Sequence, residues 1–152
     1  MDIFRPLPRL LPHERPAWAR PDSLYFITLC ALPRGQNTLC KLPLAENLWA
    51  AFVHYSDLGK WWPMLVLLMP DHLHALMTFA DGRNIARTLG AWKGYTARTL
   101  GVTWQKDFFE HRLRHDESWR EKSAYIEATH VRSGLAASLD EWPYVWRSRL
   151  PV

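Results

Sequence analysis

Two histidines separated by a single leucine lie in the segment LMPDHLHALM, residues 68–77. Side chains two residues apart on a β-strand point to the same face, so His72 and His74 could bind one divalent cation together. Pairs at this spacing also arise by chance, because the chain contains seven histidines. A third ligand and a reactive group have to come from elsewhere. The pair alone leaves open either a metal site or two ordinary strand residues.

A later segment, YIEATHVRSG, offers such groups. Tyr125 and Thr129 are four residues apart, and on a helix side chains at this spacing share a face. His130 follows directly. Tyr125 and the polar residue Thr129 could therefore both face a cation held by the strand histidines. The alternative is a half-buried helix tyrosine with its hydroxyl in solvent.

The charge and the aromatic content favour nucleic acid as a partner. The chain has 19 Lys and Arg against 15 Asp and Glu, a net charge of +4, and nine tryptophans. Arginine forks match phosphate geometry, and unpaired bases stack on aromatic rings. This composition is typical of proteins that bind single-stranded nucleic acid, although a mildly basic protein with tryptophan in its core has the same composition.

Other features bound the class of protein. At 152 residues the chain is expected to form one domain with a substantial core. Its longest apolar run, MLVLLM, is too short to span a bilayer, and no signal peptide is recognisable, so we expect no membrane partner. Two cysteines, Cys30 and Cys40, fit a reducing cytoplasm better than a disulfide scaffold.

The hydrophobic pattern predicts an arm followed by alternating strands and helices. Five prolines and four arginines at residues 1–22 predict an extended basic arm, and Pro70 predicts a kink or bulge just before His72. The tail around Trp142 has no assignable pattern. The expected elements are strand 24–30, helix 44–59, strands 64–70 and 72–80, helix 83–101, an extended segment at 103–116, and a third helix from about 116 or 118 that ends before Gly134.

This order indicates a single α+β domain over residues 23–152. An antiparallel sheet would carry helices on one face, with the other face open. Alternation puts His72, His74 and Leu76 on one face and Leu73, Ala75 and Met77 on the other. It does not say which of the two faces the helices cover.

Four motifs in register resemble one family. They are Met69-Pro70-Asp71-His72-Leu73-His74; the helix segment from Trp92-Lys93 to Arg98; the segment from Trp104-Gln105 to Arg114; and Tyr125-Ile126 followed by Val131-Arg132-Ser133-Gly134-Leu135. The pattern is similar to that of the single-tyrosine transposases of the HUH superfamily, and more closely to their REP-associated tyrosine transposase (RAYT) branch. The resemblance covers roughly residues 24–146. It implies a ferredoxin-like antiparallel sheet with packed helices.

The resemblance also implies roles for the matched residues. His72 and His74 would hold Mg²⁺ or Mn²⁺, and Tyr125 would be the nucleophile that forms a 5′-phosphotyrosine link and leaves a 3′-hydroxyl for strand transfer. The expected partner is single-stranded DNA with a small hairpin, bound by a monomer or a homodimer. We expect DNA contacts from Lys93, Arg98, Trp104, Arg112, Arg114 and Arg132.

The chain departs from the family at two positions. The family's third metal ligand is an Asn or Gln four residues after the tyrosine, and here that position is Thr129. The third ligand is therefore expected to be Thr129 or His130, although His130 lies about 100° round an ideal helix from Tyr125. Asp71 replaces the usual Asn and adds negative charge. These departures leave two alternatives open: a catalytically impaired protein that binds hairpin DNA, and a basic α+β protein with a structural metal. Tyr95 is a competing nucleophile and His111 a further candidate ligand.

Overall fold

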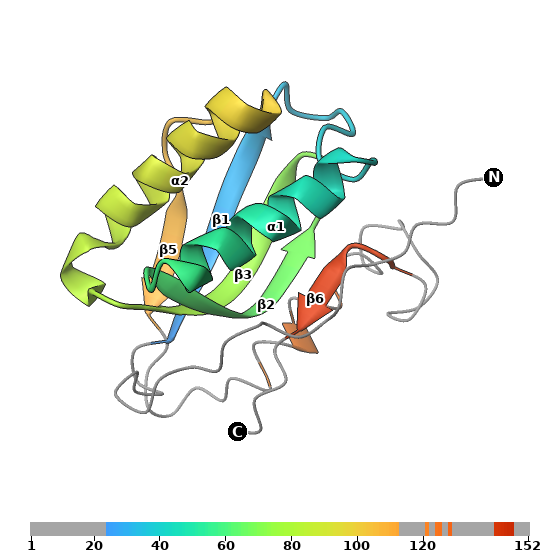
Figure 1. Cartoon of the computed structure of the whole chain (residues 1–152). Helices are drawn as coiled ribbons and strands as arrows, with labels where there is room; N and C mark the ends of the chain where they lie inside the picture. Colours follow the sequence, from blue (N-terminus) through green and yellow to red (C-terminus); the bar gives the residue numbers. More distant parts are fainter. Residues whose placement is uncertain (1–23, 113–120, 122–123, 126–127, 129–141, 148–152) are drawn as a thin grey trace.

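A six-stranded antiparallel sheet forms one layer of the structure, and two helices form a second layer across one of its faces (Figure 1). The computed structural model describes residues 24–112, 121, 124–125, 128 and 142–147. The elements are β1 (Leu24–Leu32), α1 (Leu44–Asp57), β2 (Trp61–Leu68), β3 (His72–Phe79), the 3₁₀ turn η2 (Gly82–Asn84), α2 (Ile85–Leu100), β4 (Thr103–Trp104), β5 (Phe109–Arg112) and β6 (Val145–Arg147).

The strand order is β4-β1-β3-β2-β6, and β5 pairs with β1 beside β4. Strands β1, β2 and β3 form the centre, because β3 lies between the other two and pairs antiparallel with both. With α1 connecting β1 to β2 and α2 following β3, this is the ferredoxin-like arrangement. The α+β antiparallel fold expected from the sequence is confirmed.

Ring contacts decide which face of β3 the helices cover. Phe79 of β3 packs edge-on against Trp61 of β2, with ring centroids 6.0 Å apart. Trp61 in turn lies 5.3 Å from Phe52 of α1 and 5.7 Å from Trp92 of α2. Residues two apart on a strand share a face, so Leu73, Ala75 and Met77 point to the helices together with Phe79. His72 and His74 therefore lie on the opposite face of the sheet.

Most of the tryptophans belong to the core rather than to a nucleic-acid surface. Phe52 and Trp92 have ring centroids 4.5 Å apart, and both are buried between sheet and helices. Trp146 of β6 stacks on Trp49 of α1 at 5.2 Å and an interplanar angle of 8°. The inference from tryptophan content to base stacking is wrong for the buried ones, which among the described residues are Trp49, Trp61, Trp62, Trp92, Trp142 and Trp146.

Helix α2 begins two residues later than expected, because the 3₁₀ turn η2 takes up Gly82–Asn84. It ends at Leu100, where Gly101 adopts φ 76°, a conformation that favours glycine. The kink or bulge predicted just before His72 is a bend at Pro70 and Asp71, between β2 and β3. The register shift in this strand pair falls between Pro63 and Leu65.

The tail contributes a strand that the hydrophobic pattern did not predict. Val145–Arg147 forms β6 on the free edge of β2, with Trp146 opposite Val66. The indole N–H of Trp142 donates a hydrogen bond to the Leu68 carbonyl at 2.9 Å, which fixes the approach to this strand. A short run of aromatic and β-branched residues was the available signal.

Several predictions fall on other parts of the chain. The arm at residues 1–22 and most of the third helix lie outside the described residues, although Glu121, Ala124 and Tyr125 have helical conformation and the Ala128 N–H bonds the Ala124 carbonyl at 3.0 Å. Cys30 and Cys40 are free thiols. Among the described helices, none combines the length and apolarity needed to cross a membrane.

Candidate functional site

The two histidines of β3 lie next to each other on the sheet face that points away from the helices. Their ring centroids are 4.8 Å apart and the rings are nearly perpendicular. The His72 side chain is 21% exposed, so a ligand can reach it from solvent. The side chains share a face because the strand alternates, and the antiparallel pairing with β1 determines what lies beside them.

The ring orientation of His72 is set by the preceding residue. Its Nδ1 lies 2.8 Å from Oδ1 of Asp71. An ionised carboxylate only accepts hydrogen bonds, so Nδ1 of His72 carries the proton and donates it. In the neutral ring, the lone pair then lies on Nε2. This carboxylate–histidine pairing is the arrangement that commonly orients a metal-binding imidazole.

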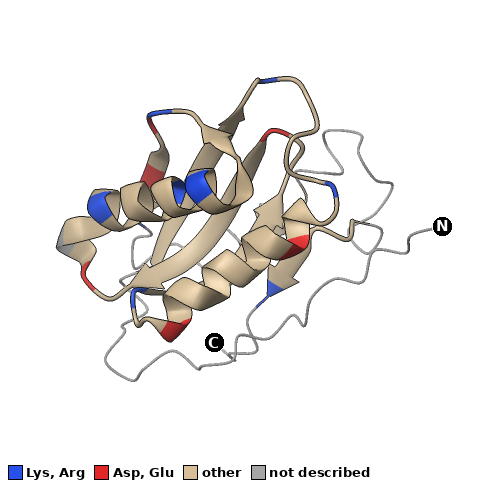
Figure 2. Ribbon diagram, turned by 45° about the horizontal axis from the view of Figure 1, so that its top comes forward, with Lys and Arg blue, Asp and Glu red and all other residues tan. Residues whose placement is uncertain are grey.

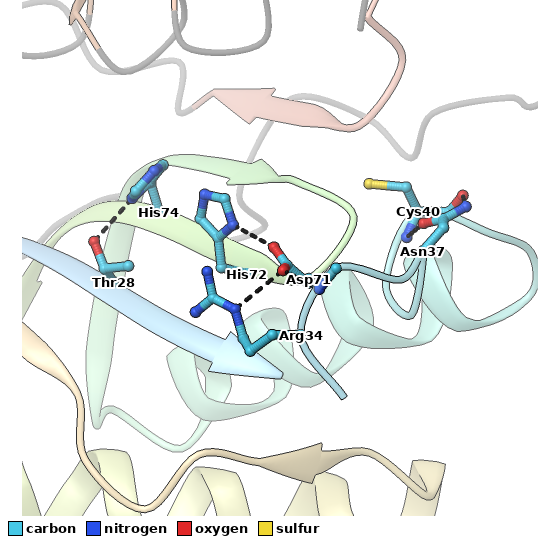
Figure 3. A network of polar contacts seen from close by, with 8 residues as sticks. Thr28, Arg34, Asn37, Cys40, Asp71, His72 and His74 are labelled. Carbon is cyan, nitrogen blue, oxygen red and sulfur yellow. Dashed lines mark hydrogen bonds and ion pairs between the residues drawn. The ribbon is translucent and has the colours of Figure 1, made fainter. Parts of the chain in front are cut away.

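His74 is held by β1 in a similar way. Thr28 lies directly opposite His74 in the strand pairing, and its hydroxyl is 2.8 Å from Nδ1 (Figure 3). The ring of Phe26 stacks on His74 with centroids 5.3 Å apart. Both imidazoles therefore have Nδ1 engaged by a protein oxygen, and both would meet a metal through Nε2.

Asp71 is fully ionised at neutral pH. Burial alone would raise its pKa, but the Gly35 N–H, the bond from His72 and the charge of Arg34 outweigh this effect and lower the pKa to about 2. The charge introduced by Asp in place of Asn is therefore compensated within the protein, by Arg34 at 3.0 Å from Oδ2.

The two imidazole nitrogens suit a divalent metal ion. The described residues supply no third His, Cys, Asp or Glu ligand beside them. No group of three His, Cys, Asp or Glu side chains among them could hold a metal ion. Thr129 and His130, the predicted third ligands, lie outside this part of the chain. His111 of β5 stands opposite Phe26, so it shares the histidine face but is separated from β3 by β1.

Tyr125, the predicted nucleophile, is exposed, with 58% of its surface accessible. The competing Tyr95 is half-buried on α2, where its ring lies 5.5 Å from that of His54 and 6.0 Å from that of Tyr55, both of α1. Tyr95 thus packs between the helices, on the side of the sheet away from His72 and His74.

Two predicted DNA-binding residues have structural contacts. The Lys93 ammonium donates to the carbonyls of Gln105 at 2.6 Å and Lys106 at 2.9 Å, and burial lowers its pKa despite the opposing charges of Asp107 and Cys30. The indole N–H of Trp104 donates to the Thr96 hydroxyl at 2.8 Å. These bonds fasten the segment after α2 to the helix.

Of the remaining predicted DNA contacts, Arg98 on α2 and Arg112 at the end of β5 are exposed. Arg114 and Arg132 lie outside the described residues. Figure 2 shows that charge divides between the helices: α2 carries Arg87, Lys93 and Arg98 without any acidic residue, whereas α1 carries acidic residues and no Lys or Arg.

We compared the chain with known proteins, by sequence and by structure. No protein-family model matches the chain. It is 28% identical over 81 residues to the REP-associated tyrosine transposase of Escherichia coli (strain K12), which is 51% of this chain and about half, 49%, of that relative. It is 24% identical over 140 residues to a putative REP-associated tyrosine transposase of Haemophilus influenzae, covering 80% of this chain and 78% of the relative.

A solved structure described as a REP-associated tyrosine transposase bound to a REP hairpin superposes with a TM-score of 0.70. The superposition covers 88% of this chain and 81% of that one, at 20% sequence identity. The resemblance to the REP-associated tyrosine transposases is confirmed. At this identity the likeness between the two structures shows a shared fold.

Within this RAYT-like fold, the sequence did not single out three residues that lie at the histidines. Thr28 reaches His74 through strand pairing, and Arg34 reaches Asp71, the partner of His72, through loop packing. Neither contact leaves a local pattern in the sequence. Phe109 of β5 lies opposite Thr28 of β1 and is 55% exposed. Its position in an extended segment rich in aromatic residues was the only available signal.

Proposed function

We propose that this chain nicks and rejoins single-stranded DNA beside a hairpin, through a covalent link to Tyr125. The observation that carries the proposal is the pair His72 and His74, both with Nδ1 engaged by protein oxygens on the sheet face away from the helices. The similarity to REP-associated tyrosine transposases, one of them solved with a REP hairpin, supports the DNA partner.

His72 and His74 would hold Mg²⁺ or Mn²⁺, with Thr129 or His130 as a third ligand. When bound, such an ion supplies Lewis-acid polarisation of a phosphate oxygen. The protein residues keep the two imidazoles oriented for this purpose: Asp71 for His72, and Thr28 with Phe26 for His74.

Tyr125 would act as the nucleophile. Its oxygen forms a bond to phosphorus, the bond between phosphorus and the 3′-oxygen breaks, and the phosphate stays on tyrosine at the 5′ end of the strand. Tyrosine gives up its proton, and the leaving 3′-oxygen takes one up. The reverse attack by the same or another 3′-hydroxyl rejoins a strand without external energy, because one phosphodiester replaces another.

The histidine face has a surface suited to an unpaired base. The exposed ring of Phe109 packs edge-on against Phe26 at 5.9 Å, and Phe26 stacks on His74. A base lying on Phe109 would be two rings away from the histidine pair. Aromatic platforms of this kind bind single strands with little sequence preference.

The test is covalent capture. A labelled hairpin oligonucleotide with single-stranded flanks is incubated with the protein and Mn²⁺, and SDS-resistant adducts are counted. We expect an adduct that Tyr125→Phe and His72→Ala each abolish and that Tyr95→Phe, the matched control, leaves intact. An adduct that persists in Tyr125→Phe would assign the nucleophile elsewhere. Hairpin binding without any adduct would indicate a protein that binds DNA but has lost the chemistry.

A further inference from the structure

The loop between β1 and α1 is fastened to the turn that precedes His72. The Ala31 N–H donates to the Asp71 carbonyl at 2.8 Å. The N–H groups of Thr38 and Leu39 both donate to the Pro70 carbonyl, at 2.8 and 2.9 Å. These backbone hydrogen bonds hold the intervening residues, 32–37, beside the histidine site.

The side chain of Asp71 joins the same loop to His72. Oδ1 accepts from His72, and Oδ2 accepts from the Gly35 N–H at 2.8 Å and from Nε of Arg34 at 3.0 Å (Figure 3). Gly35 has φ 81°, where a side chain would be strained, so the loop conformation that brings its N–H to the carboxylate depends on glycine. One carboxylate thus holds a metal-binding candidate and a guanidinium at the same time.

Arg34 reaches the histidine face of the sheet. Its Nε lies 3.0 Å from Oδ2 of Asp71. Burial is the largest single influence on the pKa of Arg34 and lowers it, but Cys30 and Asp71 together outweigh burial and raise the pKa. Cys30 stands directly opposite His72 in the pairing of β1 with β3, so its side chain shares the face with the histidines.

The guanidinium has donors left for a ligand. Arginine carries five N–H donors, and only the Nε donor bonds an oxygen of the described residues. The side chain is 49% exposed, so Nη donors that do not face Cys30 can be approached from solvent. Their planar fork matches two oxygens of a phosphate group.

We propose that Arg34 binds a backbone phosphate of the DNA strand next to the one at the His72 and His74 site, and that Asp71 is the positioning residue that holds Arg34 and His72 together. The inference rests on the function proposed above and adds a phosphate-binding residue to it. An arginine that only neutralised Asp71 could do so with its side chain buried, whereas the Arg34 side chain is 49% exposed.

The test measures DNA affinity as a function of salt, with EDTA present so that metal binding does not contribute. The full chain is titrated with the hairpin oligonucleotide between about 50 and 200 mM salt. We expect Arg34→Met to weaken binding several-fold and to lower the slope of log K against log salt by about 0.7, the value for one single-strand phosphate contact. The matched control, Arg87→Met on the helix side, loses the same charge and should leave the slope unchanged.

Two further variants keep the result decisive. Arg34→Lys retains the charge and loses the fork, so it should preserve most of the slope while binding more weakly than wild type. Asp71→Ala releases both partners, so without DNA it should lower Mn²⁺ affinity, measured by calorimetry, about 10- to 100-fold. Melting temperatures of all variants show whether each is folded.

Failure of the inference differs from failure of the proposed function. If wild type does not bind the hairpin and forms no adduct, the proposed function is wrong. If wild type binds and forms the adduct, but Arg34→Met matches Arg87→Met in affinity and slope, Arg34 has no phosphate contact and the inference alone is overturned.

Discussion

The hydroxyl of Thr28 lies 2.8 Å from Nδ1 of His74, across the pairing of β1 with β3. This contact comes from a different strand, so it holds the imidazole independently of its neighbours along β3. When Nε2 binds a metal, Nδ1 carries the proton, and the hydroxyl is then its acceptor.

Thr28→Val should therefore weaken Mn²⁺ binding. Valine has the same shape but no hydroxyl, so the His74 ring loses its orientation while strand packing is kept. We expect affinity to fall about tenfold or more, the usual effect of removing such an outer contact. Calorimetry with Mn²⁺ measures it. Thr103→Val, at an exposed position of β4, is the control, and equal affinities for the two variants would rule out the role of Thr28.

Lys93→Met should destabilise the protein although it removes a residue first expected to bind DNA. The ammonium bonds two carbonyls of the segment after α2, and methionine fills the space of the stem but cannot donate. We expect a loss of about 1 kcal/mol in the free energy of unfolding, because the site is partly open to water. Urea unfolding measures this loss, and amide exchange should increase at residues 103–106. Arg98→Met, exposed on the same helix, should change neither.

Trp146→Ala should show that the tail belongs to the domain. The indole is fully buried and stacked on Trp49, so truncation leaves a large cavity between β6 and α1. We expect a loss of about 3–5 kcal/mol in the free energy of unfolding. Trp146→Phe, which keeps an aromatic ring, should lose clearly less. A loss below about 1 kcal/mol for the alanine variant would mean that β6 adds little to the fold.

Stability in acid should depend on Asp71. Its pKa is lowered from 3.8 to about 2 in the folded protein. The carboxylate therefore stabilises the fold above pH 4, and this contribution is lost as the pH falls from about 4 toward 2. In EDTA, the difference in unfolding midpoint between wild type and Asp71→Asn should shrink over that range. A difference that stays constant with pH would show that the folded protein does not shift the pKa of Asp71.

The histidine pair and Thr28 show which features of the site can be predicted from the sequence. Alternation predicted that His72 and His74 share a face, because that property depends only on the backbone of one strand. Whether the helices cover that face depends on which side of β3 packs against Phe52 and Trp92, and no local pattern reports it. The same holds for Thr28, which meets His74 only through the register between two strands.

Residue type alone is ambiguous where one side chain can serve two purposes. Tryptophan side chains can stack on bases or pack in the core, and most of the described tryptophans are buried in the core. Lysine binds phosphate and also caps carbonyls, as Lys93 does. Asp71 looked like an isolated departure from a motif, because its partner Arg34 is 37 positions away in the sequence and reaches it only after folding.

Phe109→Ala should weaken binding of single-stranded DNA flanks while leaving the fold intact. The residue is 55% exposed and its ring packs edge-on against Phe26, so we expect its removal to expose little of the core. Loss of one stacked base should weaken the binding free energy by about 1–3 kcal/mol. Phe109→Tyr should bind as wild type does, since it keeps the ring. Leu58→Ala, at a residue 54% exposed beyond α1, is the control for loss of surface apolar area.

Oligonucleotides with 2-aminopurine at successive flank positions identify the stacked base, because its fluorescence is quenched on stacking. Quenching that survives in Phe109→Ala would place the base on another side chain and would leave Phe109 without a role in DNA binding.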